Sequence, residues 1–292
     1  MANSPSHKFG QELGLLLEEL VLHNILLPRL LEFAKSKNYY LDWQRDRKAR
    51  KGKKVTWNDK YGNAHDLDFV IESNGSEETI GRPLAFIEAA WRRYTKHSKN
   101  KAQEIQGAIL PIRELYELTA PFIGVVLAGE FTEPSLKQLE NNKFSVLYIP
   151  YETVIRSFGA IGVNISFNEK TDDKAYVVAT QQLAKLTPSN KATLLLSLMR
   201  INQDAIEAFM NKLRAALERY VIRVSVLPLF GNRHDFPSVE EAIKKISHLD
   251  ISYALGSFAK FEVVVDYNNN DMVRATFSGK ESLIDFLKLI RC

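Results

Sequence analysis

Cysteine is nearly absent from this chain of 292 residues, since Cys292 is the only one. A disulfide within the chain and a zinc site built on several cysteines are therefore excluded. No apolar run approaches the roughly 20 residues that a membrane span needs. The first residues, MANSPSHKFGQE, also lack the basic and apolar segments of a secretory signal. We expect a cytoplasmic protein with no membrane partner.

Acidic residues are scarce in two segments that carry most of the positive charge. Residues 44–60 hold eight Lys or Arg against two Asp, and residues 91–101 hold five Lys or Arg and no acid. These segments together carry +11, whereas the whole chain carries +4, so the remaining residues sum to about −7. Such segregation favours a polyanionic partner, although two solvated loops would have the same composition.

Hydrophobic periodicity predicts an α/β protein. The predicted elements are a helix over 11–35, strands over 65–72 and 84–91, a helix from Ser98, and strands over 122–131 and 144–150 around a short helix. Pro28 should kink or split the first helix. This order of elements indicates a mixed central sheet flanked by helices.

Aromatic and β-branched residues at 39–43 and 54–57 bracket the turn-prone stretch KARKGKK, which predicts a basic-tipped hairpin. After residue 161 the pattern changes to a long helical stretch, followed by a strand, a helix, a hairpin and a closing helix. We therefore predict two domains, residues 1–165 and a smaller α/β domain of residues 170–292.

Two acidic residues stand at the ends of predicted strands. In strand 84–91, Phe86, Glu88 and Ala90 share one face, and Asp68 stands at the head of the apolar stretch FVI. If the two strands pair, Asp68 and Glu88 converge on one point. Two carboxylates in a partly buried place repel each other, and the usual remedies are a shared proton or a hard cation such as Mg²⁺. Structural ion pairs would place acids at strand ends equally well.

The segments HDLDFVIE and FIEAAWRRYTKHSKNKAQEI, in this order of elements, resemble the PD-(D/E)XK nuclease superfamily and, within it, the type II restriction endonucleases. The resemblance covers about residues 10–160. It implies a restriction-endonuclease-like core in which Asp68 and Glu88 hold Mg²⁺. It also implies sequence-specific hydrolysis of phosphodiester bonds in double-stranded DNA.

The resemblance fails at one position, because the lysine of the family belongs at residue 90, where this chain has Ala90. Either the site is inactive, or a lysine of the following segment replaces the missing one. The candidates are Lys96, Lys99 and Lys101, of which we favour Lys101 and then Lys96. Glu104 could add a metal ligand, orient that lysine, or form a surface ion pair with Lys101.

The same resemblance implies that the basic segments contact the phosphates of a duplex and hold it in register. The candidate contacts are Arg45, Arg47, Arg50, Lys53, Arg92, Arg93 and Lys99. A homodimer and a companion DNA methyltransferase are expected of a restriction system, with residues 170–292 adding DNA contacts or the dimer surface. The alternatives are a non-cleaving DNA-binding protein on a degenerate nuclease fold, a repair or junction-resolving nuclease, and an interaction protein that binds an acidic partner.

Overall fold

The computed structural model describes residues 4–94, 98–168, 170–229, 231–249, 260–268 and 271–290, with the side chain of Leu118 left out. The chain divides into two compact units. Unit 1 comprises Met1–Glu114 and Phe122–Leu213, and unit 2 comprises Leu115–Pro121 and Arg214–Cys292. The division thus falls near residue 214, whereas the sequence analysis placed it at 165–170.

The helices that follow residue 170 belong to unit 1 because they bury apolar side chains against its earlier elements. They are α6 (Asp173–Ala184), α7 (Pro188–Ile201) and α8 (Gln203–Leu217). The ring of Tyr176 on α6 packs 5.6 Å from that of Phe9, and Phe209 on α8 packs 5.8 Å from Phe122. Hydrophobic burial therefore overrides the change of sequence pattern near residue 161.

The core of unit 1 is a five-stranded mixed sheet. Its strands are β1 (Tyr40–Trp43), β4 (Phe69–Ser73), β5 (Arg82–Arg92), β6 (Phe122–Gly129) and β7 (Ser145–Pro150). They lie in the order β1-β4-β5-β6-β7, with β1, β4 and β5 antiparallel and β5, β6 and β7 parallel. All eight residues of β6 are buried, as expected for a strand covered on both faces. The predicted mixed sheet is confirmed.

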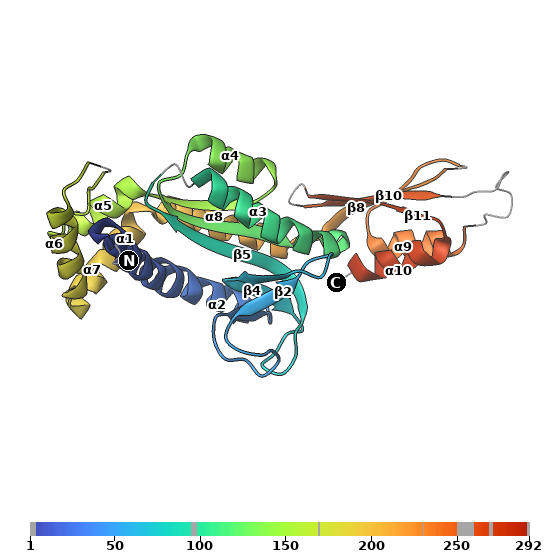
Figure 1. Ribbon diagram of the computed structural model, residues 1–292. Helices are drawn as coiled ribbons and strands as arrows, with labels where there is room; N and C mark the ends of the chain where they lie inside the picture. Colours follow the sequence, from blue (N-terminus) through green and yellow to red (C-terminus); the bar gives the residue numbers. More distant parts are fainter. Residues whose placement is uncertain are drawn as a thin grey trace. The chain divides into compact units, whose positions relative to one another are not determined.

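Helices cover both faces of this sheet (Figure 1). Helix α1 (Pro5–Leu17), the π-helix η1 (Glu18–Leu26) and α2 (Leu27–Ser36) form one helical segment on one face, where α5 (Tyr151–Gly159), α7 and α8 also lie. Helices α3 (Ser98–Leu115) and α4 (Glu133–Asn141) lie on the other face. The predicted break at Pro28 is a change of helical register, since Pro28 stands in the first turn of α2 directly after η1 and has no N–H to donate.

The predicted basic-tipped hairpin is wrong. Strand β1 pairs with β4, with Leu41 opposite Ile71, and β2 (Val55–Asn58) pairs instead with β3 (Ala64–Leu67). The basic residues between β1 and β2 are therefore a connection from the central sheet to a separate two-stranded hairpin. The pairing with β4 is favoured because it buries Leu41 and Ile71, which are 3% and 0% exposed.

Unit 2 is a smaller α/β unit with a four-stranded antiparallel sheet. Its elements are η3 (Glu117–Thr119), β8 (Val221–Pro228), β9 (His234–Phe236), α9 (Val239–Ser247), β10 (Phe261–Tyr267), β11 (Met272–Phe277) and α10 (Lys280–Ile290). The strand order is β11-β10-β8-β9. Alternate residues of β10 are buried in a core that both helices complete, and the strand, helix, hairpin and helix predicted for this region are confirmed.

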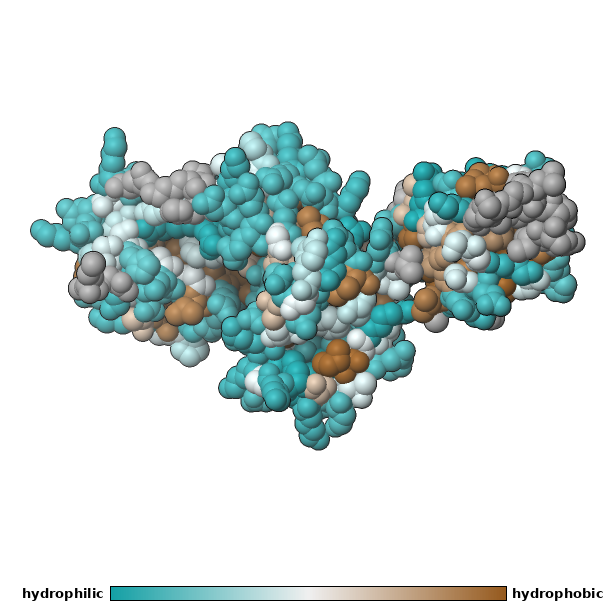
Figure 2. Space-filling view, turned by 45° about the vertical axis from the view of Figure 1, so that its right-hand side comes forward, coloured by the Kyte–Doolittle hydropathy of each residue, from teal (hydrophilic) through white to brown (hydrophobic). Residues whose placement is uncertain are grey.

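The described helices include none that is long and apolar enough to cross a membrane. Figure 2 shows hydrophilic side chains over most of the visible face, with apolar side chains in small separate groups. Scattered apolar residues of this kind are usual on protein surfaces.

Candidate functional site

Asp68 and Glu88 lie next to each other at one edge of β5. Strand β3 ends at Leu67 and β4 begins at Phe69, so Asp68 occupies the break between them. Phe69 pairs with Ile87, and one further step of the same antiparallel register places Asp68 opposite Glu88. Strand β5 continues beyond its last pair with β4, and the N–H of Ala89 donates a 2.7 Å hydrogen bond to Oδ2 of Asp68. The predicted convergence of the two acids is therefore present.

Burial and mutual repulsion make both carboxylates reluctant to ionise. Desolvation raises the pKa of Glu88 to about 8, and the negative charge of Asp68 adds to this rise. Desolvation also raises the pKa of Asp68 to about 6, against the opposing effect of the Ala89 hydrogen bond. Paired acids with raised pKa values are typical of sites that bind a proton or a cation.

Lys101 on α3 is the described lysine that acts on this pair. Its side chain is only 13% exposed, and its positive charge lowers the pKa of both Asp68 and Glu88. Lys101 and Ala90 line the same pocket, so the small side chain of Ala90 leaves that space to a lysine from a neighbouring helix. Lys99, by contrast, is exposed, and Lys96 lies outside the described residues.

Glu104 is a partner of Lys101. Nζ of Lys101 donates a 2.7 Å hydrogen bond to Oε1 of Glu104, whose side chain is 64% exposed. Of the three roles predicted for Glu104, this geometry matches the ion pair, through which the carboxylate also orients the lysine. A ligand role for Glu104 has no comparable contact to support it.

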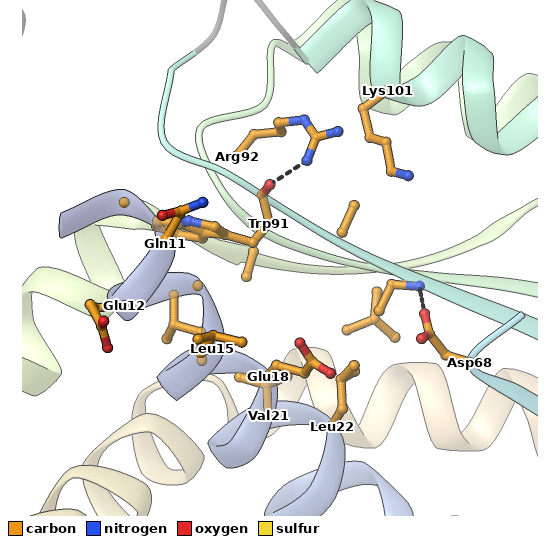
Figure 3. Close-up of a pocket in the computed structure, with 17 residues that line it drawn as sticks. Gln11, Glu12, Leu15, Glu18, Val21, Leu22, Asp68, Trp91, Arg92 and Lys101 are labelled. Atoms are coloured by element: carbon orange, nitrogen blue, oxygen red, sulfur yellow. Dashed lines mark hydrogen bonds between the residues drawn. The ribbon is translucent and has the colours of Figure 1, made fainter. Parts of the chain in front are cut away.

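A pocket of about 640 Å³ extends from this pair along the first helical segment. Figure 3 shows Asp68 and Lys101 on one side of the pocket and Gln11 and Trp91 on the other. The wall between them is largely apolar and comes from α1, η1, β5 and β6. Asp68 and Lys101 therefore border a space large enough for part of a small ligand or a nucleotide.

Glu18 is the site residue that the sequence analysis missed. It begins the π-helix η1, lines the pocket, and its negative charge raises the pKa of Asp68. Figure 3 shows its side chain directed into the pocket from the helix. The available signal was an acid inside an apolar helical stretch, but Glu19 beside it has the same appearance and pairs with Lys191 instead. π-helical turns are rare and occur often at functional sites.

The predicted phosphate contact of Arg47, in the first basic segment, does not agree with the position of its side chain. It is 3% exposed, and its donors reach the carboxylates of Asp42 and Glu72 and the carbonyl oxygens of Ser76 and Thr79. A guanidinium with every N–H group engaged inside the protein cannot take a phosphate. Arg50 is similar, because it donates to Asp42 and to three backbone carbonyls.

The other candidate contacts differ in how accessible they are. Arg45 forms a bidentate pair with Glu77, and Arg93 donates to Ser6 and lies between aromatic rings. Both are therefore structural in this arrangement. Arg92 lines the pocket and donates to the carbonyl oxygen of Trp91. Lys53 and Lys99 are exposed, and they remain candidates for a phosphate contact.

Comparisons with known proteins do not identify a family for this chain. No family model matches the chain, and no curated protein does. A solved structure entitled "Crystal Structure of Protein of Unknown Function AF1548" aligns with 60% of this chain and 96% of its own, at 9% identity and a TM-score of 0.28. A likeness of this size carries no argument about fold or function.

Proposed function

We propose that unit 1 is a Mg²⁺-dependent, sequence-specific endonuclease of the PD-(D/E)XK type that hydrolyses phosphodiester bonds of double-stranded DNA, as a type II restriction enzyme does. The observation that carries the proposal is that Asp68, Glu88 and Lys101 lie together at the point of the mixed sheet where β4 begins beside β5. A mixed sheet with helices on both faces surrounds the pair and supports the proposal, since the resemblance implies a core of this general kind.

The donor set fits a magnesium ion. Mg²⁺ prefers hard oxygen ligands and keeps several waters, so one or two carboxylates suffice. The described residues contain no cluster of three or more His, Cys, Asp and Glu side chains placed to hold a metal. When bound, the ion would lower the pKa of a coordinated water and neutralise charge on the phosphate.

The protein groups then have separate roles. Asp68 and Glu88 would hold the cation beside β5, and the Ala89 hydrogen bond fixes the direction of the Asp68 carboxylate. Lys101 would face the reacting phosphate, where its ammonium could hold the attacking water by a hydrogen bond and stabilise negative charge on the phosphate oxygens. Glu104 keeps Lys101 in position.

The first test of this proposal is cleavage of a long mixed-sequence DNA with Mg²⁺ and with EDTA. We expect discrete fragments in Mg²⁺ and uncut DNA in EDTA, since two carboxylates alone offer no nucleophile to a phosphodiester. The absence of cleavage in every divalent metal, with salt-sensitive binding retained, would favour the runner-up function, a DNA-binding protein whose site Ala90 has inactivated. Cleavage restricted to branched DNA would favour a junction-resolving nuclease.

Lys101→Ala is expected to lower the cleavage rate roughly 10²- to 10⁴-fold, the range of a lost general acid–base or charge-stabilising group. The measurement is the single-turnover rate with enzyme in excess, which separates chemistry from binding. Lys212→Ala is the matched control, because its exposed side chain lies on α8 and does not line the pocket. If Lys99→Ala removes cleavage and Lys101→Ala does not, the assignment of the lysine is wrong.

A dimer and a companion methyltransferase belong to the same proposal. Palindromic recognition requires two copies related by a two-fold axis, and a cell that cuts such sites must protect its own DNA by modification. Unit 2, with its independent sheet and core, is the proposed source of additional DNA contacts or of the dimer surface.

A further inference from the structure

The hairpin formed by β2 and β3 carries an exposed aromatic side chain at its tip. Tyr61 stands in the turn between the strands and is 72% exposed. We propose that this tip is a DNA-binding element, in which Tyr61 enters a groove of the duplex up to about 20 Å along the DNA from the cleaved bond. The inference rests on the proposed nuclease function and assigns a substrate contact that the sequence analysis did not consider.

The tip is held rigidly by a buried acid. Asp59 is 5% exposed, and Oδ1 accepts hydrogen bonds from the N–H groups of Tyr61 and Asn63 at 2.8 and 2.9 Å. Oδ2 lies 3.0 Å from Nδ2 of Asn63 and 3.0 Å from Nε2 of His65. These bonds hold the pKa of Asp59 well below its ordinary value. The turn that presents Tyr61 is therefore fixed before any partner binds, which reduces the entropy lost on binding.

The hairpin is also anchored to the core of unit 1. The ring of Trp57 on β2 packs edge-on against Phe86 of β5, at 5.5 Å between centroids. Next to the tip, the N–H of Lys60 donates to the carbonyl oxygen of Pro111, and its ammonium pairs with Glu114 on α3. The hairpin thus has contacts at its stem and at its tip, so its position relative to β5 is defined.

Chain connectivity relates the tip to the candidate active site. Tyr61 precedes Asp68 by seven residues, of which four form β3 and the first ones belong to the turn. At about 3.3 Å per extended residue, the two side chains are therefore separated by up to about 20 Å. That length spans up to about six base pairs of a duplex. A two-stranded β-ribbon also has the dimensions of the major groove. A tip at this separation can contact the same duplex whose backbone lies against Asp68.

The chemistry of the hairpin fits a nucleic acid. Lys53 precedes its first strand as an exposed cation, and Lys60, which pairs with Glu114, lies 4.9 Å from the ring of Tyr61. Its acids are not free to repel phosphate, because Asp59 is buried in the turn and Asp66 pairs with Lys54. A tyrosine ring offers a flat apolar face to a base or sugar and loses little rotamer freedom on binding.

The test uses the intact protein and a duplex that contains a mapped cleavage site, in EDTA so that no cutting occurs. Tyr61→Ala is expected to weaken binding about 10-fold, which corresponds to the loss of about 1.4 kcal/mol of aromatic contact. Tyr61→Phe should stay within about twofold if the ring carries the contact. In hydroxyl-radical footprints, Tyr61→Ala should lose protection within about six base pairs of the cut.

The matched control is Leu196→Ala on α7, whose side chain is 66% exposed and lies in unit 1. It should bind and footprint as the wild type does, and unchanged melting temperatures would show that both variants fold. If the wild type cuts DNA while Tyr61→Ala binds and footprints like it, the hairpin proposal is overturned and the nuclease proposal stands. If the wild type neither cuts nor binds a duplex, both proposals fail.

Discussion

Glu88→Gln is expected to abolish Mg²⁺-dependent cleavage and, at the same time, to make the metal-free protein more stable. The amide cannot replace a carboxylate ligand, so the rate should fall roughly 10³-fold or more. Asp68→Asn should have the same effect. Binding of duplex DNA in EDTA should remain in both variants. It should tighten only where the replaced carboxylate is ionised, which is above about pH 6 for Asp68 and above about pH 8 for Glu88.

The gain in stability follows from the raised pKa of Glu88. An unfolded glutamate ionises near pH 4.5, whereas burial and Asp68 raise the folded pKa to about 8. The folded state therefore resists ionisation, so stability is unaffected below about pH 4, falls as pH rises through this interval, and is lowest above pH 8. Glutamine avoids this loss, and we expect an increase on the order of 4 kcal/mol in the free energy of unfolding at pH 8 and none at pH 4.

Thermal unfolding in EDTA between pH 4 and pH 9 measures this difference directly. A gain of 4 kcal/mol corresponds to a rise of roughly 10 °C in melting temperature for a chain of this size. Glu140→Gln is the matched control, because Glu140 is exposed on α4 and is not among the groups that act on Glu88. A Glu88→Gln protein that melts lower than the wild type at pH 8 would mean that Glu88 is a stabilising ion-pair partner, and the metal-site assignment would then be wrong.

The fold of unit 1 was largely predictable where the signal is local. Alternation along residues 84–91 placed Glu88 and Ala90 on one face, and the observed strand β5 spans Arg82–Arg92. The pairing of β1 was not predictable in this way, because a strand of four residues has no local feature that selects β4 over β2. Burial of Leu41 against the sheet decides that choice, and burial depends on residues far along the chain.

The candidate site likewise contains residues that local sequence patterns predict and one residue that they do not. Asp68 and Glu88 were found because strand periodicity and a family resemblance both point to them. Glu18 was missed because its neighbour Glu19 has the same sequence context, and only the change to a π-helix and the packing of η1 direct one acid into the pocket and the other toward Lys191. Helical spacing alone cannot make that distinction.

The positive charge of the first basic segment was the most misleading signal in the sequence. Loss of its buried arginine is expected to have the second large effect, which is on the free energy of unfolding. Arg47→Ala is expected to lower the free energy of unfolding by about 3–5 kcal/mol, the cost of removing one member of a buried ion pair. Asp42 and Glu72 are 1% and 0% exposed. In this variant Glu72 loses the arginine that donates to both of its carboxylate oxygens, and Asp42 keeps Arg50 but loses its bond from Arg47. Urea denaturation followed by circular dichroism would measure the shift.

Arg45→Ala is the matched control for this prediction. Arg45 and its partner Glu77 are 27% and 38% exposed, so water can replace the lost contact and the expected cost is about 1 kcal/mol or less. Arg47→Lys should also be destabilising, because a lysine has three donors where the guanidinium uses five. If Arg47→Ala keeps its stability and loses only affinity for DNA, the arginine is a phosphate contact after all.

The buried cluster around Arg47 also explains why so basic a segment need not be a binding surface. Arg47 and Arg50 share Asp42, Glu72 accepts from Arg47 and from the N–H of Gly81, and a side chain at Gly75 would collide with Glu72. The loop between β1 and β2 is thereby tied to the loop that connects β4 with β5. Its arginines keep both loops in place beside β4, the strand that begins directly after Asp68. A loss of this cluster should therefore reduce cleavage through unfolding, with the activity of each remaining folded molecule preserved.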